Sequence, residues 1–132
     1  MTTRKRRVML LLAGWAGMLL LSATAAAQIP GDFMALKGRW VRTDGGYAIE
    51  VRSVEADGRI QAAYYNPNPI NVSRAEATRQ GSAVLVFLEL RAPGYPGSTY
   101  TLIHDTQSDE LKGVYHQAAR RQNFEVVFVR GK

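Results

Sequence analysis

The feature of this sequence that most constrains its fold is a succession of short runs rich in β-branched and aromatic residues. The runs begin after residue 38, and turn signals interrupt them about every 8 to 14 residues, a spacing typical of sandwiches and barrels. No stretch that follows residue 27 keeps the apolar period of a long helix, although one short helical turn is expected over 32–37. The sequence therefore predicts an all-β domain.

Eight strands are expected in this domain. They cover residues 39–43, 47–54, 59–65, 70–80, 83–91, 98–104, 111–117 and 123–130. The dipeptides Asp44-Gly45 and Asp57-Gly58 are typical of tight hairpin turns. Residues 66–69 are expected to form a loop because two prolines do not fit a paired central strand, and 92–97 are expected to form a rigid loop.

Consecutive strands joined by short turns form an antiparallel up-and-down meander. Such a sheet has two open edges unless it closes on itself, and closure removes the risk of edge-to-edge aggregation. We therefore expect an eight-stranded closed barrel, with an open or flattened sheet as the alternative.

Residues 1–27 have the three-part pattern of a cleavable secretory signal peptide. Residues 4–7 are basic, 8–21 are apolar, and 22–27 are small and end in Ala25-Ala26-Ala27. The apolar run is shorter than the roughly 20 residues that span a bilayer. We expect a periplasmic or extracellular protein whose mature form does not span a membrane. Its lead-in covers residues 28–38 and its barrel domain residues 39–132.

Removal of this segment changes the charge of the chain. The full chain has 17 Lys and Arg against 11 Asp and Glu, a net charge of +6. Four of the basic residues lie in 4–7, so the mature chain has 13 basic and 11 acidic residues and a net charge of +2. A nucleic-acid-binding domain needs a strong basic surface, so no nucleic-acid partner is expected. The chain has no cysteine, and its core must hold the fold without disulfides.

The connections after the third, fifth and seventh predicted strands lie at one end of a meander, because alternate connections share an end. They are the longest connections in the chain, and binding residues concentrate on such loops. Tyrosines suit a pocket, although core packing is the alternative for them. We expect this mouth to bind a small-molecule or extended ligand through Tyr65, Asn66, Asn68, Tyr95, Tyr100, His116, Gln117 and Arg120.

The two histidines of the chain offer the only imidazole chemistry. His104 and His116 lie at the ends of adjacent predicted strands, and Asp105 or Asp109 could supply a third metal ligand. The alternative, which we favour, is that both are polar residues at strand ends near solvent. No metal and no cofactor are therefore expected.

Two further arrangements could support catalysis. Ser98 is the most noticeable serine, but it lacks the G-x-S-x-G context of a nucleophile elbow. Glu89 and Glu76 could form a carboxylate pair for glycosidic chemistry, but nothing in their spacing requires it. We expect no catalytic residue, and a hydrolase or metal-dependent enzyme ranks behind two non-enzymatic functions.

The second of these functions is a protein-interaction module, such as a periplasmic inhibitor or an envelope assembly factor. The predicted strands 83–91 and 123–130 are apolar on both faces. A filled barrel with an exposed apolar patch at Leu85, Phe87, Val127 or Val129 would support this function, and a homodimer is one form that it could take.

The segment 33–40, which ends in Gly38-Arg39-Trp40, resembles the entry of a lipocalin-type barrel. In that family a short helical turn precedes a Gly-x-Trp on the first strand, and a basic residue at the end of the last strand covers the tryptophan. The resemblance implies that Gly38, Trp40 and Arg130 seal the base of a barrel, with the cation stacked on the indole.

The length of the chain and its strand 111–115 are more similar to the short avidin-type barrels of the same calycin group. The second lipocalin motif has no match. Trp40 is the only tryptophan after residue 27, whereas avidin-type sites use several, so biotin binding is not implied. The strand pattern also resembles small uncharacterised exported bacterial proteins, a likeness that implies no activity.

Overall fold

The computed structural model describes residues 14, 17, 19 and 28–132. The predicted signal peptide, 1–27, lies outside the described residues except at those three positions. No helix among the described residues has the length and hydropathy that a membrane span requires. The elements are α1 (Gly31–Met34), β1 (Gly38–Arg42), β2 (Ala48–Val54), β3 (Ile60–Tyr65), β4 (Pro69–Ile70), β5 (Val72–Gln80), β6 (Ala83–Ala92), β7 (Tyr95–Asp105), β8 (Glu110–Gln117) and β9 (Gln122–Arg130).

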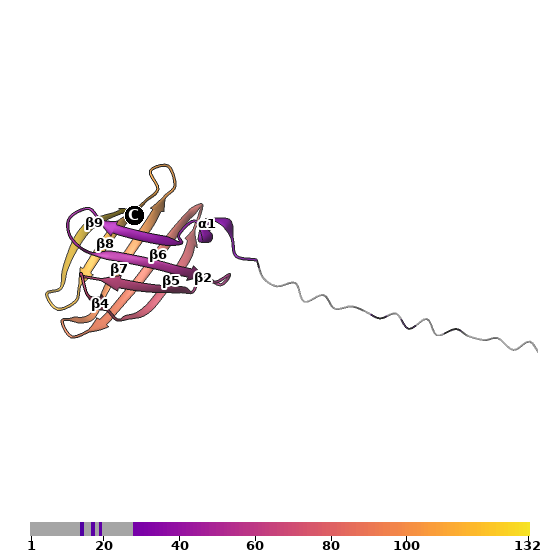
Figure 1. Cartoon of the computed structure of the whole chain (residues 1–132), viewed down its shortest axis with the longest axis horizontal. Helices are drawn as coiled ribbons and strands as arrows, with labels where there is room; N and C mark the ends of the chain where they lie inside the picture. Colours follow the sequence, from indigo (N-terminus) through magenta and orange to yellow (C-terminus); the bar gives the residue numbers. More distant parts are fainter. Residues whose placement is uncertain (1–13, 15–16, 18, 20–27) are drawn as a thin grey trace, which may run out of the picture.

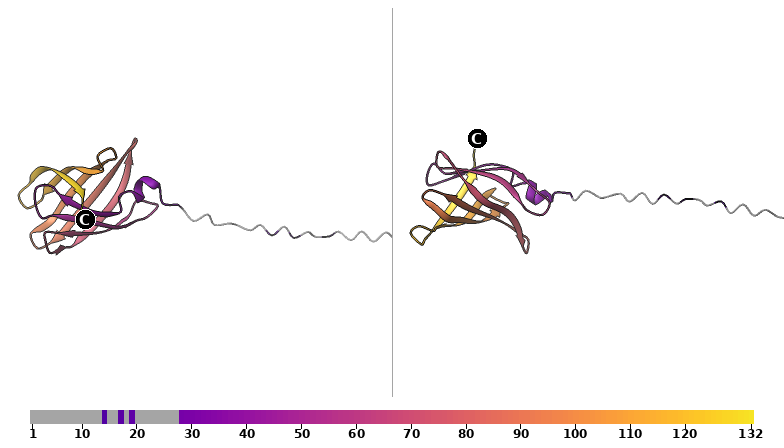
Figure 2. Two further views of the ribbon diagram at one scale, coloured as in Figure 1. Left: turned by 45° about the horizontal axis from the view of Figure 1, so that its top comes forward. Right: turned by 90° about the horizontal axis from the view of Figure 1, so that it is seen from below.

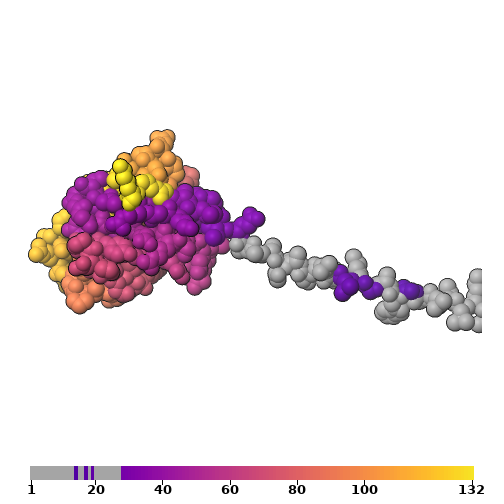
Figure 3. All heavy atoms as spheres, viewed as in Figure 1, coloured from indigo at the N-terminus to yellow at the C-terminus, as the bar shows by residue number. Residues whose placement is uncertain are grey.

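The strands form one antiparallel up-and-down sheet, which confirms the predicted fold class. Their order is β4-β3-β2-β1-β9-β8-β7-β6-β5. The sheet curls so that β1, β2 and β3 lie across from the strands β5 to β8 (Figures 1 and 2). In the space-filling view, the first three strands cover the near face of the barrel (Figure 3).

The described sheet has nine strands where the sequence predicted eight. The predicted strand 70–80 is divided at Asn71. On one side of this residue, β4 pairs with β3, and on the other side β5 pairs with β6. A local sequence pattern does not reveal this division, because it results from the partner that each half finds.

The barrel is nearly closed between β3 and β5. Arg59 and Glu76 form an isolated antiparallel bridge, and the Ala77 N–H donates to the Gly58 carbonyl at 2.6 Å. Gly58 has φ +95°, and a Cβ there would lie 2.1 Å from the Ala77 oxygen. The two ends of the sheet therefore meet at a point where only glycine leaves enough room.

Two local predictions differ from the structure in their residue bounds. The helical turn expected over 32–37 is α1, which covers Gly31–Met34. The rigid loop expected over 92–97 is wrong beyond its turn, because β7 begins at Tyr95 and pairs with β6. Pro96 lies opposite Arg91 beside a register shift, and such irregularities are where a sheet accepts proline.

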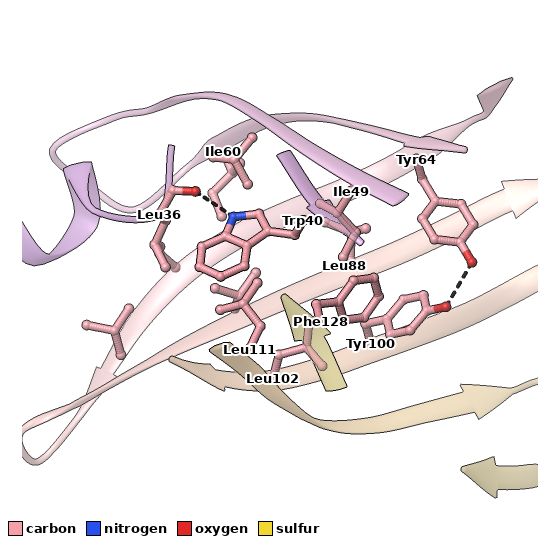
Figure 4. Packing of buried hydrophobic residues seen from close by; sticks show 14 of the residues in the cluster. Leu36, Trp40, Ile49, Ile60, Tyr64, Leu88, Tyr100, Leu102, Leu111 and Phe128 are labelled. Carbon is pink, nitrogen blue, oxygen red and sulfur yellow. Dashed lines mark hydrogen bonds between the residues drawn. The ribbon is translucent and has the colours of Figure 1, made fainter. Parts of the chain in front are cut away.

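The barrel interior is filled by side chains. The largest fully buried ones are Trp40, Tyr64, Tyr100, Phe128, Leu36, Ile49, Leu88, Leu90, Leu102, Leu111, Val51 and Val86. They come from α1's connection to β1 and from most of the strands, because alternate residues of each strand point inward (Figure 4). The interior of a barrel with about eight strands is just wide enough for its own side chains to fill. A binding site is therefore expected at one of the two ends of the barrel.

Candidate functional site

Four connections lie at one end of the barrel, which we call the barrel mouth. They follow β1, β3, β6 and β8 and cover residues 43–47, 66–68, 93–94 and 118–121. In Figure 1 they lie at the left. The opposite end, which we call the barrel base, carries α1 and the connections after β2, β5 and β7. The predicted sharing of one end by the connections at 66–68, 93–94 and 118–121 follows from this topology.

A pocket of about 360 Å³ lies at the barrel mouth, between the β1–β2 turn and the β8–β9 hairpin. We call it the mouth pocket. Its walls combine three aromatic rings with four charged or amide side chains. The seven lining residues are Arg42, Asp44, Tyr47, Tyr115, Gln117, Arg120 and Phe124.

Arg42 is the most constrained charged group of the pocket. Its side chain is only 8% exposed and donates two hydrogen bonds to the Asp44 carboxylate, both 2.7 Å long, from Nε and Nη2. Its Nη1 donates to the Tyr100 hydroxyl at 3.0 Å, and its Cζ lies 4.0 Å from the centre of the Tyr47 ring. Burial disfavours its charge, but the Asp44 and Tyr100 hydrogen bonds hold the pKa of Arg42 above its ordinary value.

Asp44 completes this pair at the surface. Its side chain is 55% exposed, and the Arg42 hydrogen bonds hold the pKa of Asp44 below its usual value of 3.8. Asp44 is therefore an ionised hydrogen-bond acceptor at neutral pH, and the guanidinium of Arg42 is already engaged.

An aromatic column runs from the core to the mouth pocket. The Tyr64 and Tyr100 hydroxyls are 2.8 Å apart (Figure 4), and burial raises the pKa of Tyr100 to about 12. Tyr100 stacks on Tyr115 with ring centroids 4.6 Å apart, and Tyr115 stacks on Phe124 at 6.4 Å. Phe124 ends the column and is 43% exposed. The pocket therefore presents an aromatic surface that the core supports from behind.

Three of the predicted ligand-binding residues belong to this region. Gln117 and Arg120 line the mouth pocket. Tyr100 is fully buried beneath it and supports Arg42. Asn66 and Tyr95 form a separate part of the mouth, where the Asn66 amide donates to the Tyr95 hydroxyl at 2.7 Å.

The other three predicted residues do not line the pocket. Tyr65 follows the inward-facing Tyr64, and the Arg39 guanidinium lies 5.7 Å from the centre of its ring. Asn68 is exposed, and its carbonyl accepts the Asn66 N–H at 3.0 Å. His116 Nδ1 lies 2.7 Å from Asn123 Oδ1, in the cross-strand pair next to Tyr115.

Five lining residues were missed by the sequence prediction: Arg42, Asp44, Tyr47, Tyr115 and Phe124. The topology indicates the location of Arg42, Asp44 and Tyr47, because the connection after the first predicted strand lies at the same end of the barrel as those after the third, fifth and seventh. The Asp44-Gly45 dipeptide of that connection indicates only a tight turn. The strand alternation that places Gln117 in the mouth also places Tyr115 there.

The alternative in which the two histidines share a metal is wrong, and so is the expectation that both lie near solvent, because His104 is buried. His104 pairs with Leu111 near the base, whereas His116 pairs with Thr99 towards the mouth. Among residues 28–132 and the three earlier described positions, no group of three His, Cys, Asp or Glu has the geometry to hold a metal ion. Ser98 is buried and accepts the Ala118 N–H at 3.1 Å, which is a structural role.

The barrel base carries the cation–aromatic contact that the family resemblance implies. Arg130 Cζ lies 3.8 Å from the centre of the Trp40 ring. Arg130 also donates to the carbonyls of Lys37 and Ala35 and to the Asp109 carboxylate. Gly38 has φ +134°, and a Cβ there would lie 2.8 Å from Arg130 Nη1.

The outer face of the sheet is partly apolar. The four residues named as a candidate patch, Leu85, Phe87, Val127 and Val129, are half-buried. Ile103 and Val114 are more exposed, at 46% and 39%. Register places Ile103 opposite Leu85 on β6. These apolar residues lie on the outside of β6 to β9, where Lys112 stands opposite both Ile103 and Val127.

Comparison with known proteins does not assign the chain to a family. No protein-family model, curated protein or solved structure matches it. The function must therefore be inferred from the geometry of the barrel.

Proposed function

We propose that this chain is an exported binding protein that takes a small or extended ligand at its barrel mouth. The observation that carries the proposal is the mouth pocket of about 360 Å³, which lies over a filled core. Ligand pockets of proteins commonly have volumes of about 300–1,000 Å³ and combine apolar surface with a few placed polar groups. The pocket lies in this range of volumes, and its wall combines three aromatic rings with four charged or amide side chains.

The state of its charged groups favours binding over catalysis. An acid or base catalyst works best when its pKa lies near the operating pH. The pKa of Asp44 is instead held below 3.8 by Arg42, and Arg42 is fixed by Asp44 and Tyr100. Such groups position a ligand without exchanging protons with it.

Two features support the location and the wider relationship. The signal-peptide pattern of residues 1–27 supports export to the periplasm or the extracellular space. The Arg130 guanidinium over Trp40, with Gly38 beside it, supports membership of the calycin group, in which ligand-binding barrels are common. Binding at one open end is consistent with both.

A second candidate function is a protein-interaction module, which a specific observation favours. Ile103 and Val114 are exposed large apolar residues on the outside of a filled barrel, and Leu85 and Val127 flank them. Apolar residues that gather on an outer face mark interaction surfaces. A homodimer through this face is one form of the second function.

Native mass spectrometry of the exported protein, purified without denaturation, tests both candidates. Retention of a ligand mass that Phe124→Ala removes is the expected result, because Phe124 is the exposed aromatic surface of the pocket. The matched control is Phe87→Ala, which removes a phenylalanine from the outer face. A dimer that Val114→Ser dissociates would favour the second function, and a bare monomer would contradict both.

A further inference from the structure

The aromatic surface of the mouth pocket has one free side. Phe124 stacks on Tyr115 with an angle of 26° between the ring planes, so the core-side face of Phe124 is turned towards a neighbouring ring. Its exposed part faces the pocket. Of the other two rings in the wall, Tyr115 is buried and Tyr47 carries the Arg42 guanidinium 4.0 Å from its ring centre. A ligand ring can therefore stack on Phe124 through one of its faces. A ligand that is apolar on both faces would leave its second face in water.

The rim of the pocket offers hydrogen bonds of both kinds. Asp44 is an ionised acceptor, and Gln117 carries an amide that donates and accepts. These two side chains come from different parts of the wall, the β1–β2 turn and the end of β8. The set suits a ligand whose edge carries hydroxyl groups, because each hydroxyl both donates and accepts.

The remaining cation gives the pocket its charge. Asp44 neutralises Arg42, whereas Arg120 is exposed and makes no hydrogen bond or ion pair with another described residue. Arg121, in the same connection, is also exposed. The fork of an arginine side chain matches a carboxylate in a bidentate pair. The free charge of the pocket is therefore positive and placed for an anionic group.

From these three observations we infer that the ligand is an acidic saccharide, a sugar ring that carries a carboxylate. Its C–H face lies on Phe124, its hydroxyls bond to Asp44 and Gln117, and its carboxylate pairs with Arg120. This inference rests on the proposed function, since it names the ligand class of the same pocket. A flat aromatic acid fits less well, because it carries no hydroxyl groups that could donate to the remaining lone pairs of Asp44.

The test is a titration of the isotopically labelled protein, followed by amide chemical shifts. The probes are trisaccharides of galacturonate, mannuronate and glucuronate. Each is compared with its neutral counterpart, the trisaccharide of galactose, mannose or glucose. At least one acidic probe should shift the amides of Gln117, Arg120 and Phe124 and bind at least tenfold more tightly than its neutral counterpart. Benzoate is the control for a simple aromatic acid.

Variants separate the contributions of the ring and the charge. Arg120→Gln should weaken the acidic probe about tenfold and leave the neutral one unchanged. Phe124→Ala should abolish both. Arg52→Gln is the matched charge control, because Arg52 is exposed on β2 and pairs with Glu50 away from the pocket. It should change neither affinity.

Each contrary result has a distinct meaning. Equal binding of acidic and neutral probes would overturn the role of Arg120, and benzoate binding alone would overturn the saccharide. If no probe binds while the exported protein retains another mass that Phe124→Ala removes, the saccharide is wrong and the proposed function stands. If no probe binds and no mass is retained, both fail.

Discussion

The guanidinium of Arg130 lies 3.8 Å from the centre of the Trp40 ring and closes the base of the barrel. The same side chain joins three segments, since it donates to Lys37 before β1 and to Asp109 before β8 while standing at the end of β9. Trp40 is itself fixed by a 2.8 Å hydrogen bond from its indole nitrogen to the Leu36 carbonyl.

Replacement of Arg130 by methionine should lower the free energy of unfolding by about 2–3 kcal/mol, since it removes the cation–aromatic contact and charge-assisted hydrogen bonds. Methionine keeps apolar contact with Trp40, so the fold should survive. Urea unfolding gives the measurement, with Arg52→Gln as the control that should change it by less than about 0.5 kcal/mol. A loss within that range for Arg130→Met would show that the cap does not stabilise the base.

Gly38→Ala should destabilise the barrel by about 1–3 kcal/mol, because Gly38 has φ +134° and its new methyl would meet Arg130 Nη1. The double variant with Arg130→Met should lose less than the sum of the single losses, since one of the clashing groups is gone. Unfolding free energies of the four proteins in this cycle provide the measurement. Strict additivity would mean that the two residues do not contact each other in solution.

Tyr100→Phe should cost about 1–3 kcal/mol, because it leaves the buried Nη1 of Arg42 without its acceptor. Tyr64→Phe should cost less, since the Tyr100 hydroxyl then still accepts from Arg42. Thermal and urea unfolding of the two variants can be compared directly, because both remove one hydroxyl from the same buried pair. An equal or larger loss for Tyr64→Phe would contradict this order.

The buried tyrosines should make the fold sensitive to alkali. Burial raises the pKa of Tyr100 from 10.0 to about 12 and raises the pKa of Tyr64 as well. The folded state thus favours the protonated form, and this stability is fully present below pH 10 and is lost as pH rises from 10 through 12. Tyrosinate absorbance and circular dichroism, followed together, should show late-titrating tyrosines that ionise as the fold is lost. Titration of all six tyrosines near pH 10 in a folded chain would refute the prediction.

Acid should weaken the barrel base. The Arg130 hydrogen bonds, and then His104, lower the pKa of Asp109 from 3.8. The stability that this carboxylate contributes is present above pH 3.8 and is lost as pH falls below that value. Asp109→Asn should therefore flatten the fall in stability below about pH 4, as measured by urea unfolding at several pH values. An unchanged slope in this variant would exclude Asp109 as a source of the acid sensitivity.

The fold could be predicted because most strands alternate in a way that a single sequence reveals. In β6, for example, Val84, Val86, Leu88 and Leu90 are all buried as the pattern indicates. The division at Asn71 and the pairing of Pro96 could not be predicted, since both depend on partners far along the chain. The prolines and glycines of residues 92–97 indicate a loop, but pairing with β6 extends β7 back to Tyr95.

Only part of the candidate site could be predicted from the sequence. The topology rule placed Gln117 and Arg120 at the right end, and both line the pocket. Asp44 lies in the first connection, which shares that end, but its Asp-Gly sequence indicates only a tight turn. The burial of Arg42 could not be inferred, because an arginine at the end of a strand is usually solvated, and its partner Tyr100 is 58 positions away.

Around the barrel the strands follow one another in chain order, and the two edges of the sheet are β4 and β5. The ladder between β1 and β9 therefore joins the first and the last of the described strands in chain order. As the strands assemble in that order, one edge of β1 has no partner until β9 is in place. An unpaired edge is a template for pairing with other chains, so the partly assembled barrel passes through a stage in which it is prone to aggregate. The hydrogen bond from the Gly131 N–H to the Arg39 carbonyl forms only once β9 has reached β1, at the end of that stage.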